Sequence, residues 1–108
     1  MLVDRYTNLD LVLAKISQQD AVLLYFSGVN CSVCDALKPK ISQLVAEQFP
    51  EVVQIEIHLQ QLNTISSYFG VFSIPTILFF REGKEWLREG RNLSVGRLLA
   101  DIGRIQSY

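Results

Sequence analysis

The chain has 108 residues, of which 49% are hydrophobic and 19% are charged. This length and composition predict a globular chain with a core of its own and exclude a disordered one. The formal net charge is −1, which gives no reason to expect nucleic acid or an anionic membrane surface as a partner. We therefore expect residues 1–108 to form a single domain.

The beginning of the sequence carries neither the basic nor the apolar segment of a secretory signal peptide. The longest apolar runs, such as residues 21–26, are far shorter than the ~20 residues of a membrane-spanning helix. We therefore expect a cytoplasmic protein without membrane partners. Because the cytosol keeps thiols reduced, a cysteine pair there indicates catalysis or metal binding more than a structural disulfide.

Apolar residues recur with helical spacing near the start of the chain, after an expected short edge strand. Thr7 is the predicted N-cap of this helix. Residues 21–26 are apolar without alternation, which is typical of a strand buried on both faces. The apolar residues of the first helix have the spacing i, i+3, i+4 and i+7, and they are Leu9, Val12, Leu13 and Ile16.

The middle of the chain alternates between helix and strand patterns. A helix is predicted over residues 31–48, and Pro39 inside it should kink it by removing a backbone hydrogen bond. Residues 52–57 predict a second buried strand. A helix over residues 60–69 follows, and Gly70 is expected to end it.

The last third of the chain predicts a hairpin and a final helix. Residues 76–81 and 84–88 are strand patterns around Glu82-Gly83, which is a hairpin signal. Ser94 can cap the last helix. The order (β)αβαβαββα predicts an α/β fold whose central mixed sheet has helices on both faces. The inner face of the last helix consists of Val95, Leu98, Leu99, Ile102 and Ile105.

The two cysteines of the chain stand three positions apart, directly after a predicted buried strand and at the start of a helix. Open α/β folds place their chemistry at this end of the strands, and the unpaired N–H groups of a helix N-terminus favour a thiolate over a thiol. We therefore predict thiol–disulfide exchange. Cys31 is the expected nucleophile, and Cys34, one helical turn further, is expected to resolve the mixed disulfide.

The cysteine pair allows three other interpretations. The cysteines could be inert core residues, or they could form a structural disulfide, which a reducing compartment disfavours. They could also hold half of a zinc site, but only His58 is left as a further nitrogen ligand, so that a metal or iron–sulfur cluster would have to be shared between two chains. We expect no metal, no other cofactor and a monomer.

The cysteine pair and several other motifs resemble the thioredoxin family over essentially the whole chain. Cys31-Ser32-Val33-Cys34 matches its two-cysteine motif, Pro39 its helix proline, and Ile74-Pro75-Thr76 the segment that contains its cis-proline. The resemblance implies a thioredoxin-like fold and an enzyme that reduces disulfides of protein partners, with a thioredoxin reductase as candidate electron donor and a role in cell redox homeostasis. It also implies that Ile74, before a cis Pro75, pairs its backbone with an extended substrate.

The sequence departs from the family pattern around the cysteines. Asn30 stands where thioredoxins usually carry a tryptophan, and Ser32-Val33 stands in place of Gly-Pro. No histidine lies between the cysteines, which favours a reductase over an oxidase. Asn30, Phe72, Ile74 and Pro75 are the candidate substrate-binding residues; Phe72, with Val29, would form an apolar docking patch if it is exposed, and a core role for Phe72 is the alternative.

The buried acid of the family is also absent from its usual strand. Tyr25 stands where thioredoxins carry the aspartate that manages the proton of the resolving cysteine, and Glu56 stands where they carry its partner lysine. We expect Glu56 to act as the general base for Cys34, with a raised pKa and with Tyr25 as a hydrogen-bonding neighbour. The alternative is that Glu56 reaches solvent at the end of its strand.

Two further functional hypotheses belong to other classes. A thioredoxin-fold redox sensor or binding module would use the cysteine pair to control docking and would turn over poorly. A metal-bridged dimer is the third hypothesis.

Overall fold

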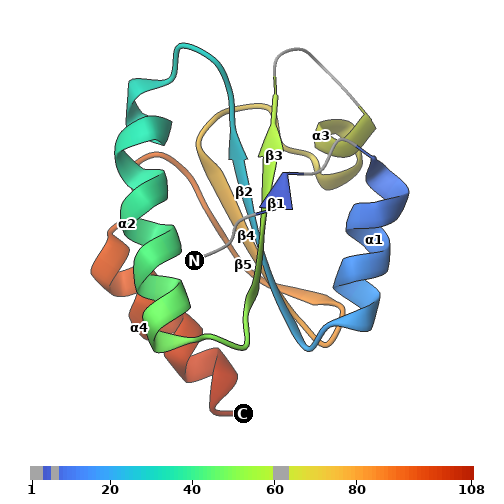
Figure 1. Ribbon diagram of the computed structural model, residues 1–108, viewed down its shortest axis with the longest axis vertical. Coiled ribbons are helices and arrows are strands. Elements are labelled where there is room, and N and C mark those ends of the chain that lie inside the picture. Colours follow the sequence, from blue (N-terminus) through green and yellow to red (C-terminus); the bar gives the residue numbers. More distant parts are fainter. Residues whose placement is uncertain (1–3, 6–7, 60–63) are drawn as a thin grey trace.

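The computed structural model describes residues 4–5, 8–59 and 64–108, which contain five strands and four helices (Figure 1). The strands are β1 (Asp4–Arg5), β2 (Ala21–Ser27), β3 (Val53–His58), β4 (Thr76–Arg81) and β5 (Lys84–Glu89). The helices are α1 (Leu9–Gln18), α2 (Ser32–Gln48), α3 (Thr64–Phe69) and α4 (Val95–Gln106). Their order along the chain confirms the predicted one.

The strands form one mixed sheet in the order β1-β3-β2-β4-β5. β2 is its central strand, because it pairs in parallel with β3 and antiparallel with β4. The parallel pair is connected through α2, and the antiparallel strands β4 and β5 are joined by a tight hairpin, as the sequence predicts.

Helices cover both faces of the sheet: α2 and α4 pack on one face, and α1 and α3 on the other (Figure 1). The alternation of side chains along β2 produces two apolar clusters. Leu23 and Tyr25 point into the cluster under α2 and α4, whereas Val22 and Leu24 point into the cluster under α1 and α3. All residues of β2 are buried, which explains why its sequence is apolar without alternation.

α2 is the longest of the described helices, with 17 residues. Pro39 lies inside it, as predicted. Ile41 and Val45 of α2 are fully buried against the sheet. None of the helices in the described ranges is both long and apolar enough to cross a membrane.

The N-cap of α1 differs from the prediction by one residue. Asn8 is the cap, and its side-chain oxygen accepts a hydrogen bond from the N–H of Leu11 at 3.2 Å. Asn caps a helix at least as well as Thr does, so the capping chemistry predicted for Thr7 is supplied by its neighbour. Thr7 itself and residues 60–63, the predicted start of α3, lie outside the described residues.

Two predicted turns have the expected backbone. Gly70 follows α3 with a φ of +66°, and Gly83 lies in the β4–β5 hairpin with a φ of +79°. The hairpin turn also places Glu82 at a φ of +53°, so both central residues are left-handed, as a type I′ hairpin turn requires. Ser94 caps α4 as predicted.

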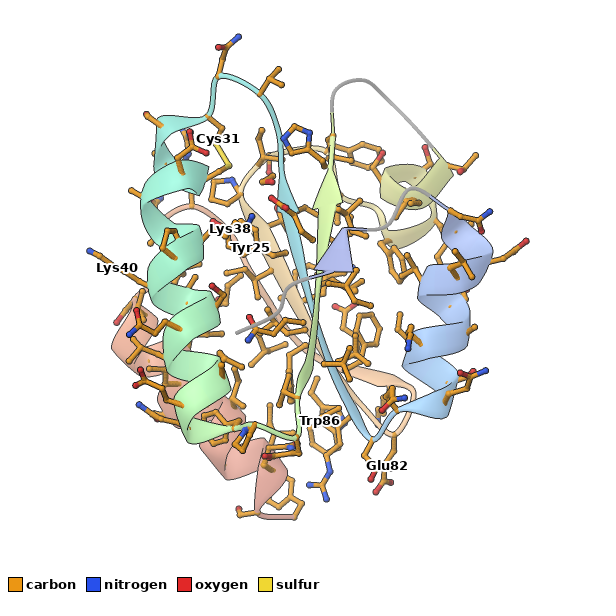
Figure 2. The ribbon with its side chains drawn as sticks, in the orientation of Figure 1. Tyr25, Cys31, Lys38, Lys40, Glu82 and Trp86 are labelled. Carbon is orange, nitrogen blue, oxygen red and sulfur yellow. A yellow bond between two sulfur atoms is a disulfide. The ribbon has the colours of Figure 1, made fainter. Side chains whose placement is uncertain are left out.

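Trp86 lies on β5, close to the hairpin and at the opposite end of the molecule from Cys31 (Figure 2). Its side chain is 41% exposed. The indole N–H donates a hydrogen bond to the carbonyl of Arg81 at 3.3 Å, and the ring packs against Tyr108 with centroids 5.6 Å apart. The residue therefore packs on the surface of the hairpin.

Candidate active site

Cys31 and Cys34 form a disulfide at the start of α2, just beyond the carboxyl end of β2 (Figure 2). Their Cα atoms are 5.2 Å apart. Cys31 is the N-cap of α2, and its Sγ accepts a hydrogen bond from the backbone N–H of Cys34 at 3.2 Å. Cys31 is 7% exposed and Cys34 is 1% exposed. Cys31 is therefore the more exposed residue of the pair.

The helix start favours negative charge on the Cys31 sulfur. The N–H groups of the first turn of α2 have no acceptor within the helix, and the helix dipole adds a partial positive charge there. After reduction, the N–H of Cys34 that now bonds Sγ can hold the Cys31 thiolate. Asp35, also in the first turn, is exposed, so solvent screens the charge that opposes this thiolate.

Gly28 allows the turn before Cys31 to pack closely against two other segments. A Cβ atom at Gly28 would lie 2.6 Å from the carbonyl oxygen of Leu59 and 2.9 Å from Cδ1 of Ile74. Asn30 follows with a φ of +55°, a conformation that asparagine tolerates better than most residues, and it is exposed. Gly28 is not among the predicted site residues; the signal for it in the sequence is a glycine directly after a buried strand.

The loop between α3 and β4 carries the other candidate substrate-binding residues. The Ile74–Pro75 peptide bond is cis, the geometry that the resemblance implies. Ile74 is half-buried and packs against the apolar cluster that contains both cysteines. Phe72 is 76% exposed and Val29 is 55% exposed, so the core role considered for Phe72 is wrong.

Glu56 is buried on β3, where it faces Tyr25 of β2 in the parallel register. The residue is 4% exposed. Its carboxylate accepts hydrogen bonds from Ser27 Oγ at 2.8 Å and from Lys38 Nζ at 3.0 Å. Lys38 belongs to α2, so this ion pair joins the helix that carries the cysteines to the sheet. The alternative in which Glu56 reaches solvent is wrong, because the carboxylate is enclosed and paired.

Tyr25, the neighbour of Glu56 on β2, contacts Cys34 directly. Its hydroxyl donates a hydrogen bond to the carbonyl oxygen of Cys34 at 3.0 Å, and the residue is 3% exposed. Figure 2 places Tyr25 and Lys38 between α2 and the sheet, on the side of Cys31. Burial, and then the negative charges of Glu56 and Asp35, raise the pKa of Tyr25 to about 12. The phenol therefore keeps its proton at neutral pH and acts as a donor.

The structure adds partners that the sequence analysis did not name. Lys38 lies four residues after Cys34, which places the two on one side of α2, but this spacing does not specify its contact with Glu56. His58 ends β3, and its Nδ1 is buried without a hydrogen-bond partner among the described residues. Among residues 4–5, 8–59 and 64–108, no group of three or more His, Cys, Asp or Glu side chains could hold a metal ion.

Known proteins with a similar sequence or fold are thioredoxins and thioredoxin-like proteins. The family model described as Thioredoxin matches residues 3–101. The thioredoxin-like protein YdfQ of Bacillus subtilis is 31% identical over 90 residues, which are 83% of this chain and 80% of that protein. A thioredoxin of Chlamydia muridarum is 36% identical over 64 residues, which are 59% of this chain and 62% of the relative. The crystal structure of thioredoxin from Trypanosoma brucei brucei superposes with a TM-score of 0.85 at 21% identity, covering 99% and 93% of the two chains.

A mixed sheet between two helix layers and a disulfide-forming cysteine pair at a helix start define a thiol–disulfide oxidoreductase. The chain belongs to the thioredoxin family. The resemblance seen in the sequence is thus confirmed, together with the thioredoxin-like fold and the enzyme class that it implies.

Proposed function

We propose that the protein reduces disulfides in protein partners, with Cys31 as the nucleophile and Cys34 as the resolving cysteine. The observation that carries this proposal is the unequal placement of the two sulfurs. Cys31 caps α2 and is the more exposed, whereas Cys34 is enclosed behind it. One sulfur that a partner can reach and a second that it cannot reach suit a two-step exchange.

The cycle begins with the reduced enzyme. The Cys31 thiolate attacks one sulfur of the partner's disulfide; a new S–S bond forms, and the other partner sulfur leaves as a thiolate. The thiol of Cys34 then gives its proton to a base, and its sulfur attacks Cys31. The partner's second sulfur leaves as a thiolate, and the enzyme is left with the Cys31–Cys34 disulfide. The partner has gained two electrons, which a thioredoxin reductase would restore to the enzyme.

The surface around Cys31 would bind an extended segment of the partner. Phe72 and Val29 supply exposed apolar area, and Asn30 supplies a polar side chain in the turn that leads to Cys31. The backbone of Ile74, held beside the cysteines by its own packing and preceding Pro75, would pair with the partner's main chain.

Glu56 is the base that we propose for Cys34. This role is supported by the position of the carboxylate, which is buried on the sheet face that α2 covers and is held in place by Ser27 and Lys38. Tyr25 keeps its own proton and fixes the backbone of Cys34.

The reducing direction suits a reducing compartment. We place the protein in the cytoplasm, as a monomer, because a monomer leaves the Cys31 surface free for partners and the cytosol supplies reduced donors. The reduction potential of the pair, measured by equilibration with glutathione, tests the direction. A value more positive than that of the glutathione pool would point to an oxidase.

Insulin reduction coupled to thioredoxin reductase and NADPH tests the activity. We expect steady turnover by the wild type, none by Cys31→Ser, and a trapped mixed disulfide with Cys34→Ser. A redox sensor would instead form the mixed disulfide without sustained turnover. Absence of turnover in the wild type, with its cysteines reduced at the start, would contradict the proposed function.

A further inference from the structure

Arg88 on β5 connects this strand to the loop that precedes Pro75. Its guanidinium donates hydrogen bonds to two backbone carbonyls at the end of α3, from Nη2 to Phe69 at 2.7 Å and from Nη1 to Gly70 at 3.3 Å. α3 has six residues, and the last carbonyls of a helix lack partners within it. A cation at this end of the helix supplies those partners and complements the dipole.

The guanidinium is itself held in a fixed direction. Glu85, on the same strand, accepts from Nε of Arg88 at 3.0 Å and from Nη2 at 3.0 Å. Two parallel bonds between an arginine and a carboxylate fix the plane of the guanidinium as well as its position. The donors that reach Phe69 and Gly70 are thus set before any partner binds.

Apolar packing anchors the start of the loop in the cluster under α1 and α3, through Val71, which is 2% exposed. Toward β5, the loop borders a cavity. A cavity of about 250 Å³ lies between residues 70–73 of the loop, Thr76, and residues 88–90. Phe72 is 76% exposed, so its ring does not anchor the loop either. The polar contacts of Arg88 therefore carry much of the connection between the start of the loop and the strand.

We propose that Arg88 is a positioning residue for protein substrates: it holds the loop over residues 70–75 so that Phe72 and Ile74 meet the partner beside Cys31. The proposal rests on the proposed function, since it assumes that proteins dock on this loop. A small disulfide needs only the sulfur of Cys31, so its reduction does not depend on Arg88.

The test compares Arg88→Gln with Arg91→Gln, which removes the same charge from an exposed arginine three residues further along. For Arg88→Gln we expect KM for insulin to rise about three- to tenfold, with kcat within about twofold of the wild type. Reduction of hydroxyethyl disulfide should be unchanged in both variants. Arg88→Lys, which can still reach one carbonyl, should fall between the wild type and Arg88→Gln.

Two results would overturn the proposal. One is an unchanged KM for insulin in Arg88→Gln. The other is an equal loss of activity on insulin and on hydroxyethyl disulfide together with a lower unfolding temperature, because that pattern belongs to a general loss of stability.

A readout without substrate keeps this proposal separate from the proposed function. Amide hydrogen exchange over residues 69–76 should be faster in Arg88→Gln than in Arg91→Gln or the wild type. If exchange is unchanged, Arg88 does not hold the loop, whatever the activity of the enzyme. If exchange is faster but the wild type fails to reduce insulin, the loop is held by Arg88 and the proposed function is what fails.

Discussion

At the scale of single residues, the feature that distinguishes this site is a buried carboxylate whose cationic partner comes from the helix. Glu56 lies on β3 and Lys38 on α2, with Nζ and Oε1 3.0 Å apart. Burying a carboxylate is costly unless hydrogen bonds and a counter-charge compensate it. Ser27 and Lys38 supply both, so the carboxylate can stay ionised on the sheet face that α2 covers without access to solvent.

The role of Glu56 as a base predicts a defect in one step only. Glu56→Gln keeps the size of the side chain but cannot take a proton at neutral pH. We expect the first attack by Cys31 to be unchanged, and resolution of the mixed disulfide by Cys34 to slow by roughly 10- to 100-fold at pH 7. Rapid-quench trapping of the mixed disulfide measures both steps.

Glu47→Gln, an exposed change on α2, is the matched control for Glu56→Gln. A normal resolution rate in Glu56→Gln would remove the carboxylate from the mechanism. Slowing of both steps alike would indicate a displaced helix start instead of a missing base.

The raised pKa of Tyr25 makes stability depend on alkaline pH. The ordinary value is 10.0 and the folded value is about 12, so the unfolded chain loses this proton first as the pH rises. The stabilisation is complete well below pH 10 and is lost toward pH 12; by pH 11 it has fallen by about 1 kcal/mol.

Tyr25→Phe isolates this effect, because the other titrating groups are common to both proteins. At pH 9 we expect the variant to be less stable by about 1 kcal/mol, through loss of the hydrogen bond to Cys34. The difference should vanish or reverse by pH 11. Urea unfolding at both pH values measures it, and a difference that does not change with pH would contradict the prediction.

At the scale of elements, the site lies where three segment ends meet. The turn after β2, the residue after β3 and the residue before Pro75 are brought together at Gly28, which touches Leu59 and Ile74. The contact with Leu59 is continued by a backbone hydrogen bond from its N–H to the carbonyl of Ser27. The position of Cys31 relative to the cis-proline loop therefore depends on the absence of a side chain at Gly28.

Gly28→Ala should separate these segments. The added Cβ would meet a backbone carbonyl at 2.6 Å, so we expect a loss of about 1–3 kcal/mol of unfolding free energy and a higher KM for insulin. Gly96→Ala, in α4, is the control: its Cβ would meet only Ser94 Oγ, at 4.0 Å, and alanine favours the helix, so stability should rise by up to about 1 kcal/mol. Urea unfolding of the two variants tests the contrast, and equal effects would contradict it.

At the scale of the whole molecule, the order of elements and the position of the cysteines could be predicted because their signals are local. The spacing of apolar residues determines the type of an element from the residues of that element alone. The caps and turns at Gly70, Gly83 and Ser94 likewise depend on only a few neighbouring residues. The contacts of Lys38 with Glu56 and of Arg88 with Gly70 join segments that are distant in sequence, and no local pattern specifies them. Phe72 shows the same limit, since its exposure depends on how the loop lies against β5.

The site of Trp86 has a spectroscopic consequence. The chain has one tryptophan, and it lies near the β4–β5 hairpin while Cys31 lies at the other end of the molecule (Figure 2). Asn30 stands where relatives place an indole beside the cysteines. We therefore expect the intrinsic emission of this protein to follow the packing of Trp86 against Tyr108 and not to be quenched by the disulfide. Oxidised and reduced samples can be compared in unfolding with the same optical signal.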